Sequence, residues 1–413
     1  MKFINHWIHN IFVYTIKEVT HIRSKMAEST GSTVSKKVLI KVNQAHPFGN
    51  LHDHHPAYTI PPQELFDELT KLTPKFMNNV GVTIGSHQFV LFHYKSSCED
   101  SKVWNTFWNK YTLNGRSVVF QTDGELKIIS PGLVKRFEAS VQLDVNDLIA
   151  KYHSVPCTAT EKMDGQYCSV VILDDDTRVV NSSQSFNNDV VTNVTQELEK
   201  LHAFDKMQKN IVHIFEFVQS QIKCQYDKSR HGLYLITLVE PNGVIYPYDA
   251  ITREAERLGT FVVPIKQFTN IDDVVAWSNS MCDGELTTEG VVVTFADGFG
   301  VKVKTPLYYK CVFESMAFTK KDKLAYCIAE ILPNFRDAER REKFIAECNI
   351  IIAQFDALVQ PICDFVEANK HLDDKALIKA TCDAGISPRC LTFIKKRDIS
   401  QKRMIYRCFV DDV

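Results

Sequence analysis

A short segment of the chain carries side chains that could perform covalent nucleotide chemistry. Residues 160–165 read Thr-Glu-Lys-Met-Asp-Gly, in which Lys162 offers an amine, Asp164 a carboxylate, and Gly165 a site where backbone could approach a nucleotide closely. A lysine attacks phosphorus only without its proton, so burial or neighbouring cations must lower its pKa well below ~10.4. Average composition produces a Lys-x-Asp-Gly string by chance in about one chain in ten of this length. The segment therefore needs support from other residues.

Three segments downstream of Lys162 supply the other groups that this chemistry requires. Glu216 lies between two phenylalanines, Glu289 precedes an apolar Gly-Val-Val-Val run, and Lys302 and Lys304 alternate with valines. On a strand, alternate side chains share a face, so the two lysines would lie side by side and favour an anion between them. A triphosphate needs such cations, together with Mg²⁺ to offset the charge on its oxygens. For each segment taken alone, an ordinary solvent-facing strand is the alternative.

The order of these segments resembles the motif order of covalent nucleotidyltransferases, which comprise DNA ligases, RNA ligases and mRNA capping enzymes. Within that superfamily the chain is most similar to the phage-type RNA ligase 1 family, over about 62–310. Residues 114–120 (Asn-Gly-Arg-Ser-Val-Val-Phe) resemble the family's Arg-Gly strand, although here the glycine comes first. Residues 131–137 (Pro-Gly-Leu-Val-Lys-Arg-Phe) resemble its Lys-Phe-Phe segment, and Tyr308 falls where the family has a tyrosine after the paired lysines.

This resemblance implies roles for the matching residues. Lys162 would attack the ATP α-phosphate and carry AMP as a phosphoramidate, assisted by Lys302 and Lys304 at that phosphate. Glu216 would contact the ribose or the hydrated metal, and Glu289 would help bind metal and orient the lysine. ATP is the implied substrate and Mg²⁺ or Mn²⁺ the implied cofactor. The remaining residues implied to bind the nucleotide or the RNA 5′-phosphate are Arg116, Lys135, Phe137, Glu161, Gly165 and Tyr308.

The resemblance fails at one point. Downstream of its nucleophile the family has a Lys-Ser-Lys-Gly-like strand, whereas residues 180–185 here read Val-Asn-Ser-Ser-Gln-Ser, without a lysine. A contact to the triphosphate is then either missing or made by polar donors such as Asn181 and Ser183. We expect weaker ATP binding rather than lost activity.

The implied activity is ATP-dependent RNA ligation. AMP passes from the lysine to an RNA 5′-phosphate, and a 3′-hydroxyl then displaces AMP and seals the strand, in RNA repair or splicing with tRNA as one candidate substrate. The alternatives are a DNA ligase, a GTP-using capping enzyme, and an inactive RNA-binding relative. A DNA ligase or capping enzyme usually continues into a β-barrel domain with a further basic motif. Only Arg397-Asp398 imitates that motif here.

Hydrophobic periodicity indicates the elements that must position these residues. Pro61-Pro62 begins a helix with one apolar face, and from about 81 to 310 short β-branched runs alternate with turn dipeptides such as Asp123-Gly124 and Asp297-Gly298. Helices are expected around 188–208 and 249–258, and the helical period continues after 310. The sequence therefore predicts an α+β fold. The resemblance makes its core a mixed or antiparallel-sheet nucleotidyltransferase (an ATP-grasp-like ligase), followed by an all-α C-terminal domain.

The predicted domains are a leader and flexible linker (1–36), an adenylyltransferase domain (37–310) and a helical domain (311–413) that could specify the RNA. The leader lacks a secretory cleavage pattern, and a poorly ordered leader and a mitochondrial presequence both stay open. No run approaches the ~20 apolar residues of a membrane span, so no membrane association is expected. We expect a cytoplasmic monomer, with the nucleus and mitochondrion left open, that receives RNA ends from separate healing kinases or phosphatases.

Charge and metal-binding residue types set further limits. A net charge of −2 excludes a uniformly basic nucleic-acid binder but not a local basic groove. The twelve cysteines form no Cys-x-x-Cys pair and are expected to be free thiols rather than a disulfide or zinc framework. A histidine-rich patch is expected to be a surface loop rather than a zinc site. Its members are His46, His52, His54 and His55.

The C-terminal end contains a basic cluster interleaved with aromatic residues. Either a phosphate-contacting surface or a solvated basic helix end would explain it. Its residues are Phe393, Lys395, Lys396, Arg397, Lys402, Arg403, Tyr406 and Arg407.

Overall fold

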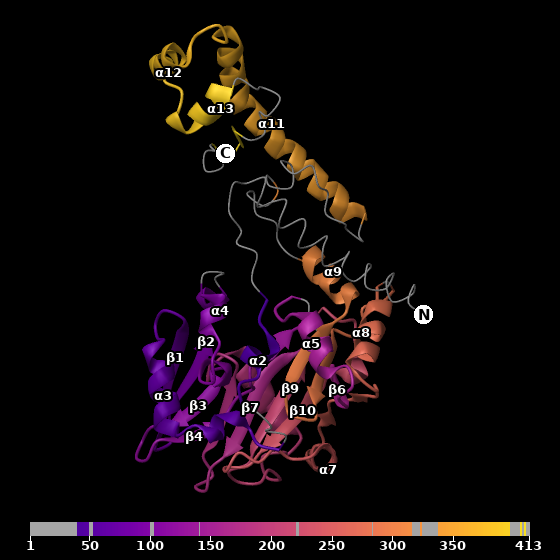
Figure 1. Ribbon diagram of the computed structural model, residues 1–413. Helices are drawn as coiled ribbons and strands as arrows, with labels where there is room; N and C mark the ends of the chain where they lie inside the picture. The colour runs from indigo at the N-terminus through magenta and orange to yellow at the C-terminus, as the bar shows by residue number, and fades with distance from the viewer. Residues whose placement is uncertain are drawn as a thin grey trace. The chain divides into compact units, whose positions relative to one another are not determined.

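The computed structural model describes residues 39–48, 53–99, 103–139, 141–219, 223–282, 284–315, 323, 338–396, 405–406 and 409. It contains two compact units, which meet in the chain between Cys311 and Val312. Of the described residues, those up to Cys311 belong to unit 1 and the later ones to unit 2 (Figure 1). The predicted leader, 1–36, lies outside the described residues, and the three-domain division stays a prediction.

Unit 1 contains three β-sheets. The first has the order β1-β2-β3-β4, the second β11-β10-β9-β7-β8, and the third β12-β6-β13-β14-β5. Most neighbours are antiparallel, while the pairs β10–β11 and β14–β5 are parallel. The strands are β1 (Met77–Ile84), β2 (His87–Tyr94), β3 (Val118–Gln121), β4 (Lys127–Ser130), β5 (Phe137–Glu138), β6 (Cys157–Lys162), β7 (Gln166–Ile172), β8 (Arg178–Ser182), β9 (Val212–Val218), β10 (Gly232–Val239), β11 (Phe261–Val262), β12 (Ile265–Lys266), β13 (Gly290–Phe295) and β14 (Gly300–Lys304).

Helices surround these sheets (Figure 1). The α-helices up to the boundary are α2 (Val42–Ala45), α3 (Pro62–Lys71), α4 (Trp104–Phe107), α5 (Val145–Tyr152), α6 (Asp189–Lys200), α7 (Tyr248–Leu258), α8 (Ile271–Ser280) and α9 (Pro306–Ser315). Short 3-10 turns occur at η1 (Pro56–Thr59), η2 (Ser96–Glu99), η3 (Thr112–Asn114) and η4 (Lys228–Arg230). The predicted α+β class is confirmed, and the turns at Asp123-Gly124 and Asp297-Gly298 join β3 to β4 and β13 to β14 as expected.

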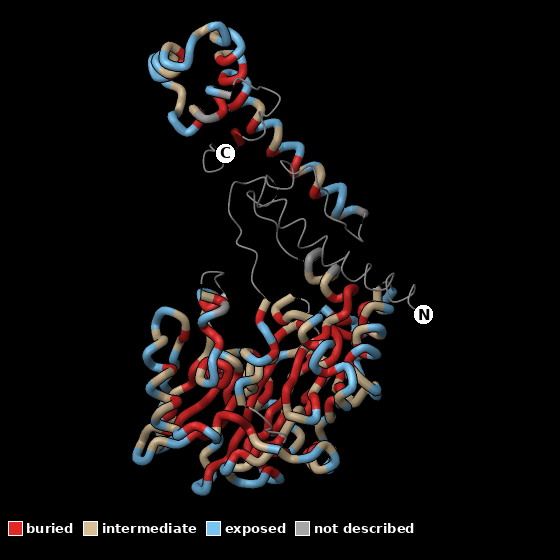
Figure 2. The backbone as a smooth tube through the Cα atoms, viewed as in Figure 1, coloured by how far each residue is buried: buried red, intermediate tan, exposed pale blue. Residues whose placement is uncertain are grey.

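Apolar cores between the layers hold unit 1 together, and Figure 2 shows the buried backbone concentrated in the sheets. Phe89 of the first sheet and Ile214 of the second belong to one core, so these sheets pack face to face. The opposite face of the second sheet packs on α6 and α7, through residues such as Val194 and Ile251. One face of the third sheet packs on α5 and α8. Strand alternation leaves the other face of the third sheet available for polar side chains.

Unit 2 is helical in its described residues, as predicted. Its elements are α11 (Ala338–Ala368), α12 (Asp374–Asp383), η5 (Pro388–Cys390) and α13 (Leu391–Lys396). One helical segment, Arg341–Ala368, is long and apolar enough to cross a membrane by length and composition, which the sequence analysis did not expect. Core helices pass the same test, and Phe355, Val359 and Val366 of this helix pack in the core of unit 2.

The cysteine prediction is confirmed for the ten cysteines that the structure describes, since all are free thiols. The surface-loop prediction for the histidines is wrong for His55, which is buried. Its Nδ1 accepts a hydrogen bond from the Ala57 N–H, which fixes the ring at the start of η1. His54 is about half exposed, and His52 lies outside the described residues.

Candidate active site

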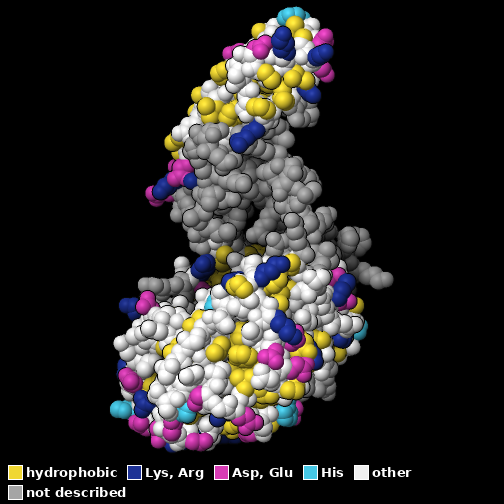
Figure 3. Space-filling view, turned by 90° about the vertical axis from the view of Figure 1, so that its left-hand side faces the viewer, with side chains coloured by type: hydrophobic (Ala, Val, Ile, Leu, Met, Phe, Trp, Pro, Cys, Tyr) yellow, Lys and Arg dark blue, Asp and Glu magenta, His cyan; other side chains and the backbone are white. Residues whose placement is uncertain are grey.

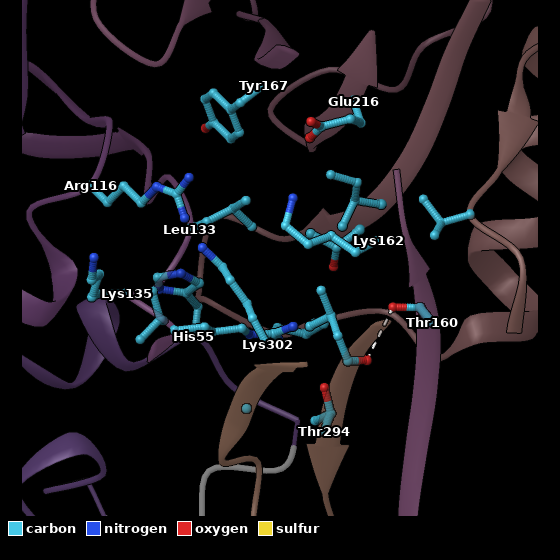
Figure 4. Close-up of a pocket in the computed structure, with 18 of the residues that line it drawn as sticks. His55, Arg116, Leu133, Lys135, Thr160, Lys162, Tyr167, Glu216, Thr294 and Lys302 are labelled. Atoms are coloured by element: carbon cyan, nitrogen blue, oxygen red, sulfur yellow. Dashed lines mark hydrogen bonds between the residues drawn. The ribbon is translucent and has the colours of Figure 1, made fainter. Parts of the chain in front are cut away.

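A cavity of about 750 Å³ lies within unit 1, between the second and third sheets. Figure 4 shows Arg116, Lys162, Lys302 and Glu216 converging on it from different segments. All four line the cavity. On the molecular face in Figure 3, acidic and basic side chains are interspersed, in line with the small net charge.

Three neighbouring strands of the third sheet form the floor of this cavity. Lys162 on β6 is paired with Gly290 on β13, and Gly290 is paired with Lys304 on β14. Gly290 has a φ of +153°, and a Cβ there would lie 2.2 Å from the Val303 carbonyl oxygen. Only glycine fits between the two lysines, so strand pairing brings them into one row. The next row on the same face consists of Thr160, Val292 and Lys302.

Glu289 connects the two lysines of the first row. One carboxylate oxygen lies 2.6 Å from Lys162 Nζ and the other 3.2 Å from Lys304 Nζ. Lys304 also lies 2.8 Å from a carboxylate oxygen of Glu138. Although burial opposes it, the two carboxylates raise the pKa of Lys304, so this lysine stays charged.

Lys302 has no carboxylate partner among the described residues. Burial, reinforced by the charges of Arg116, Lys162 and Lys135, holds the pKa of Lys302 well below its usual value. The neighbouring valines of β14 pack into the core on the opposite face, so the lysine must project into the cavity. An anionic ligand there would be attracted to it.

Glu216 faces this group of cations from the second sheet. Burial raises its pKa to about 6, against the opposing effect of Lys162 and Arg116. Gly165 allows this placement, because a Cβ there would lie 2.8 Å from Glu216 Cγ and 2.7 Å from the Phe217 carbonyl oxygen. Gly165 thus accommodates strand β9 and also lines the cavity, so its predicted contact with a nucleotide stays a prediction.

Asp164 connects the loop between β9 and β10 to α9. One of its carboxylate oxygens accepts hydrogen bonds from the backbone N–H groups of Lys223 and Cys224, at 2.7 and 2.9 Å. The other accepts from the Tyr308 hydroxyl at 3.3 Å. Lys304 Nζ lies 5.3 Å from the centre of the Tyr308 ring. Tyr308 therefore contacts the lysine row rather than lining the cavity.

The other sequence-derived site residues lie in different environments. Lys135 lines the cavity with its ammonium 5.0 Å from the Trp108 ring, while Phe137 is fully buried in the core beneath. Glu161 lines the cavity but pairs with Arg230 at 2.9 Å. The structure thus places Phe137 in the core and not in the cavity.

The segment without a lysine, 180–185, contributes Ser182, Ser183 and Gln184 to the cavity lining. Asn181 is buried and donates to the Ser182 carbonyl oxygen, so it does not lie in the cavity. Of the two polar donors considered from sequence, only Ser183 faces this space.

Sequence reasoning missed three charged residues of this region. Arg136 lines the cavity, Glu138 pairs with Lys304, and Arg230 pairs with Glu161. Arg136 and Glu138 are the chain neighbours of Phe137, a residue that the sequence already predicted for the site. Their charges next to a predicted site residue could have identified them. Arg230 had no such signal, because it lies far from Glu161 in sequence.

The C-terminal basic cluster is only partly described. Phe393 and Tyr406 are buried in the core of unit 2, where the Tyr406 hydroxyl donates to Asp356. These two aromatics therefore do not belong to an RNA-contacting surface. The side chains of Lys396, Arg397, Lys402, Arg403 and Arg407 lie outside the described residues.

The carboxylates that line the cavity could bind a divalent metal only together with phosphate oxygens of a ligand. The described residues contain no group of three or more His, Cys, Asp or Glu that could hold a metal. Mg²⁺ binds through one or two carboxylates, substrate phosphates and water. Glu216 meets this requirement, whereas both oxygens of Glu289 are paired with lysines.

Comparisons with known proteins identify related chains. Residues 114–314 match the family model described as RNA ligase. An archaeal ATP-dependent RNA ligase (form 2) is 13% identical over 76% of this chain and 83% of that chain, with a TM-score of 0.44. A Naegleria gruberi RNA ligase variant with ATP and Mn is 15% identical over 42% and 56% of the two chains, with a TM-score of 0.34. A search of curated protein sequences found no match.

Proposed function

From the match of residues 114–314 to the RNA ligase family model, we propose that the chain is an ATP-dependent RNA ligase that joins an RNA 5′-phosphate to a 3′-hydroxyl. The observation that carries the proposal is the row Lys162–Gly290–Lys304 with Glu289 bridging its two amines. This row joins an attacking amine, a proton acceptor and a phosphate-binding cation at one point.

In the first step Lys162 Nζ gives up a proton and attacks the α-phosphorus of ATP. Glu289 takes that proton, since its oxygen lies 2.6 Å from Nζ. The new N–P bond replaces the bond from phosphorus to the bridging oxygen, and pyrophosphate leaves with the electron pair. Lys304 and Lys302 offset the negative charge that develops on the phosphate oxygens.

Glu216 would hold a divalent metal together with the phosphates. When bound, Mg²⁺ or Mn²⁺ would neutralise phosphate oxygens and orient them. Glu216 forms no ion pair with the described residues of unit 1 and lines the cavity, so its carboxylate is available for this purpose.

Two later steps complete the reaction. An RNA 5′-phosphate oxygen attacks the lysyl-AMP phosphorus, which restores Lys162 and leaves a 5′-5′ pyrophosphate. A 3′-hydroxyl then attacks the RNA phosphate and displaces AMP. Arg116 and Lys302, which form no ion pair with the described residues, line the cavity where these phosphates would bind.

The first experiment is intact-mass spectrometry of the full chain after incubation with Mg²⁺ and either ATP or GTP. We expect an AMP adduct with ATP, no adduct with GTP, and loss of the adduct in Lys162→Met. The exposed Lys200→Met is the control and should retain it. A GMP adduct would indicate a capping enzyme, and an adduct that survives in Lys162→Met would refute the assigned nucleophile.

We further propose broken RNA, such as a nicked anticodon stem-loop, as the substrate, for a cytoplasmic monomer that depends on separate end-healing enzymes. Sealing of a nicked stem-loop should exceed sealing of nicked duplex DNA at least tenfold. Faster sealing of DNA would contradict the RNA assignment. Ends bearing a 5′-hydroxyl should not be sealed until a kinase has phosphorylated them.

A further inference from the structure

Arg136 is a cation of the cavity without an anionic partner among the residues that the structure describes. Its side chain lines the cavity, and none of the ion pairs found in unit 1 includes it. The charged group that acts on it is another cation, Arg116, and burial together with that charge lowers the pKa of Arg136 to about 10. A partly buried charge without an anionic partner is unfavourable, so an anion that binds at this position from outside the chain would be stabilised.

The guanidinium of Arg136 lies directly on the floor of the cavity. A Cβ at Gly300 would lie 2.6 Å from Arg136 Nε and 3.0 Å from its Cζ. Gly300 is paired with Thr294 on β13, two residues beyond the row that contains Lys302. The absence of a side chain at Gly300 therefore leaves room for the guanidinium on the strand.

Three cations follow one another along this floor. Lys162 lies in the first row, Lys302 in the second, and Arg136 above the third, where Gly300 is located. Each row is two residues beyond the last, or about 7 Å along the strands. A ligand whose negative charges extend away from the nucleophile would meet these cations in turn.

The surroundings of Arg136 favour an anion there. His55 lies near it and is neutral, because burial and the charge of Arg136 lower its pKa to about 3. The facing segment, Ser182–Gln184, contributes no cation. Arg136 and Arg116 supply positive charge here, and Lys135 also lines the cavity.

We propose that Arg136 binds the pyrophosphate portion of the triphosphate, which leaves as Lys162 bonds to the α-phosphorus. This inference rests on the proposed function, because it takes the orientation of the triphosphate from the position of the nucleophile. The bridging oxygen gains negative charge as its bond to the α-phosphorus breaks, and a guanidinium beside the leaving group stabilises that charge. Arg136 thus acts on the leaving group, whereas Lys302 and Lys304 act on the α-phosphate.

The test is calorimetric titration of the full chain, freed of AMP, with pyrophosphate and Mg²⁺. Arg136→Met removes the charge at similar volume and should weaken pyrophosphate binding by about 10- to 100-fold, as expected for loss of a charge-assisted hydrogen bond. Arg178→Met is the matched control, since Arg178 is exposed and lies over the Phe204 ring. It should bind pyrophosphate like the unaltered chain. Unchanged pyrophosphate affinity in Arg136→Met would overturn the proposal.

Thermal unfolding without ligand separates ligand binding from a structural role. If Arg136 is an unpaired cation awaiting an anion, Arg136→Met should unfold at the same or a higher temperature than the unaltered chain. A lower unfolding temperature would indicate a structural arginine and would overturn the assignment. Gly300→Ala keeps the charge but displaces the guanidinium, and should also weaken pyrophosphate binding.

Sealing of pre-adenylylated RNA tests whether Arg136 binds the pyrophosphate of ATP or a phosphate of the RNA. This reaction needs no ATP, so Arg136→Met should leave its rate within about twofold of the unaltered chain. An equal loss in this reaction and in pyrophosphate binding would assign Arg136 to the RNA phosphate and overturn the proposal. Pyrophosphate binding requires no turnover, so a chain that forms no AMP adduct would refute the proposed function while leaving this titration interpretable.

Discussion

The ion pair between Lys162 and Glu289 should contribute far more to stability than an ion pair of equal length on the surface. Lys162→Met and Glu289→Gln, alone and together, form a double-mutant cycle that isolates the interaction between the two side chains. Lys71 and Glu68 on α3 provide the control, because their charged atoms lie 2.5 Å apart, against 2.6 Å for Lys162 and Glu289. Distance alone predicts equal coupling in the two pairs.

Burial is what differs between the two pairs. The side chains of Lys162 and Glu289 are 19% and 4% exposed, whereas those of Lys71 and Glu68 are 67% and 35% exposed. The gross attraction at 2.6 Å is about 6 kcal/mol at an effective dielectric constant of 20, and desolvation offsets most of it. We expect a coupling of about 2 kcal/mol for the site pair and below ~0.5 kcal/mol for the helix pair.

Urea unfolding followed by tryptophan fluorescence is the appropriate assay. The three described tryptophans, Trp104, Trp108 and Trp277, all belong to unit 1, the unit that contains the site. In Lys162→Met, Glu289 keeps Lys304 as a partner, and in Glu289→Gln, Lys304 keeps Glu138. The cycle therefore reports one contact. A coupling for Lys162 and Glu289 no larger than that of the surface pair would refute the reasoning.

Three further predictions concern the same cavity. Gly290→Ala should lower the free energy of unfolding by about 2 kcal/mol more than Gly124→Ala, since both glycines have positive φ but only Gly290 has no room for a Cβ; equal losses in urea unfolding would contradict this. Glu216 has a pKa of about 6 in the fold against an ordinary value of 4.5. The folded state therefore binds more protons around these values, and stability should fall by about 2 kcal/mol in total as pH rises from about 3.5 to about 7. Glu216→Gln should abolish this fall, and parallel pH profiles for the two chains would exclude Glu216 as its source. Asp164→Asn should lower the free energy of unfolding by about 1–3 kcal/mol, because a neutral amide oxygen accepts the two backbone N–H groups more weakly than a carboxylate and the amide NH2 cannot accept from the Tyr308 hydroxyl; unfolding at the same urea concentration as the unaltered chain would argue against it.

The lysine row could be predicted because it depends on strand alternation and on one hairpin. Lys302 and Lys304 had to share a face, and the Asp297-Gly298 turn folds β14 back on β13, which starts immediately after Glu289. The α+β class followed from the change of hydrophobic period after about 310. These features depend on residues close together in the chain, so a single sequence is enough to predict them.

The errors arose where side-chain direction depends on packing between distant segments. β5 has only two residues, too few for alternation to show that Phe137 faces the core and Glu138 faces Lys304. His55 lies among loop-forming residues, yet tertiary packing buries it beside the cavity. Arg136 adjoins a predicted site residue, but its position over Gly300 depends on strand pairing that no local pattern encodes.

The hairpin between β13 and β14 makes the chemistry of the chain sensitive to insertion length. Residues 296–299 connect the strand that carries Gly290 to the strand that carries both paired lysines. A slip of β14 by one residue would send Lys302 and Lys304 into the core and present valines to the cavity, because neighbouring positions face opposite sides of a sheet. A turn lengthened by two residues could keep the lysines of β14 facing the cavity and its valines facing the core. One extra residue would have to form a bulge, or the lysines and valines would exchange faces.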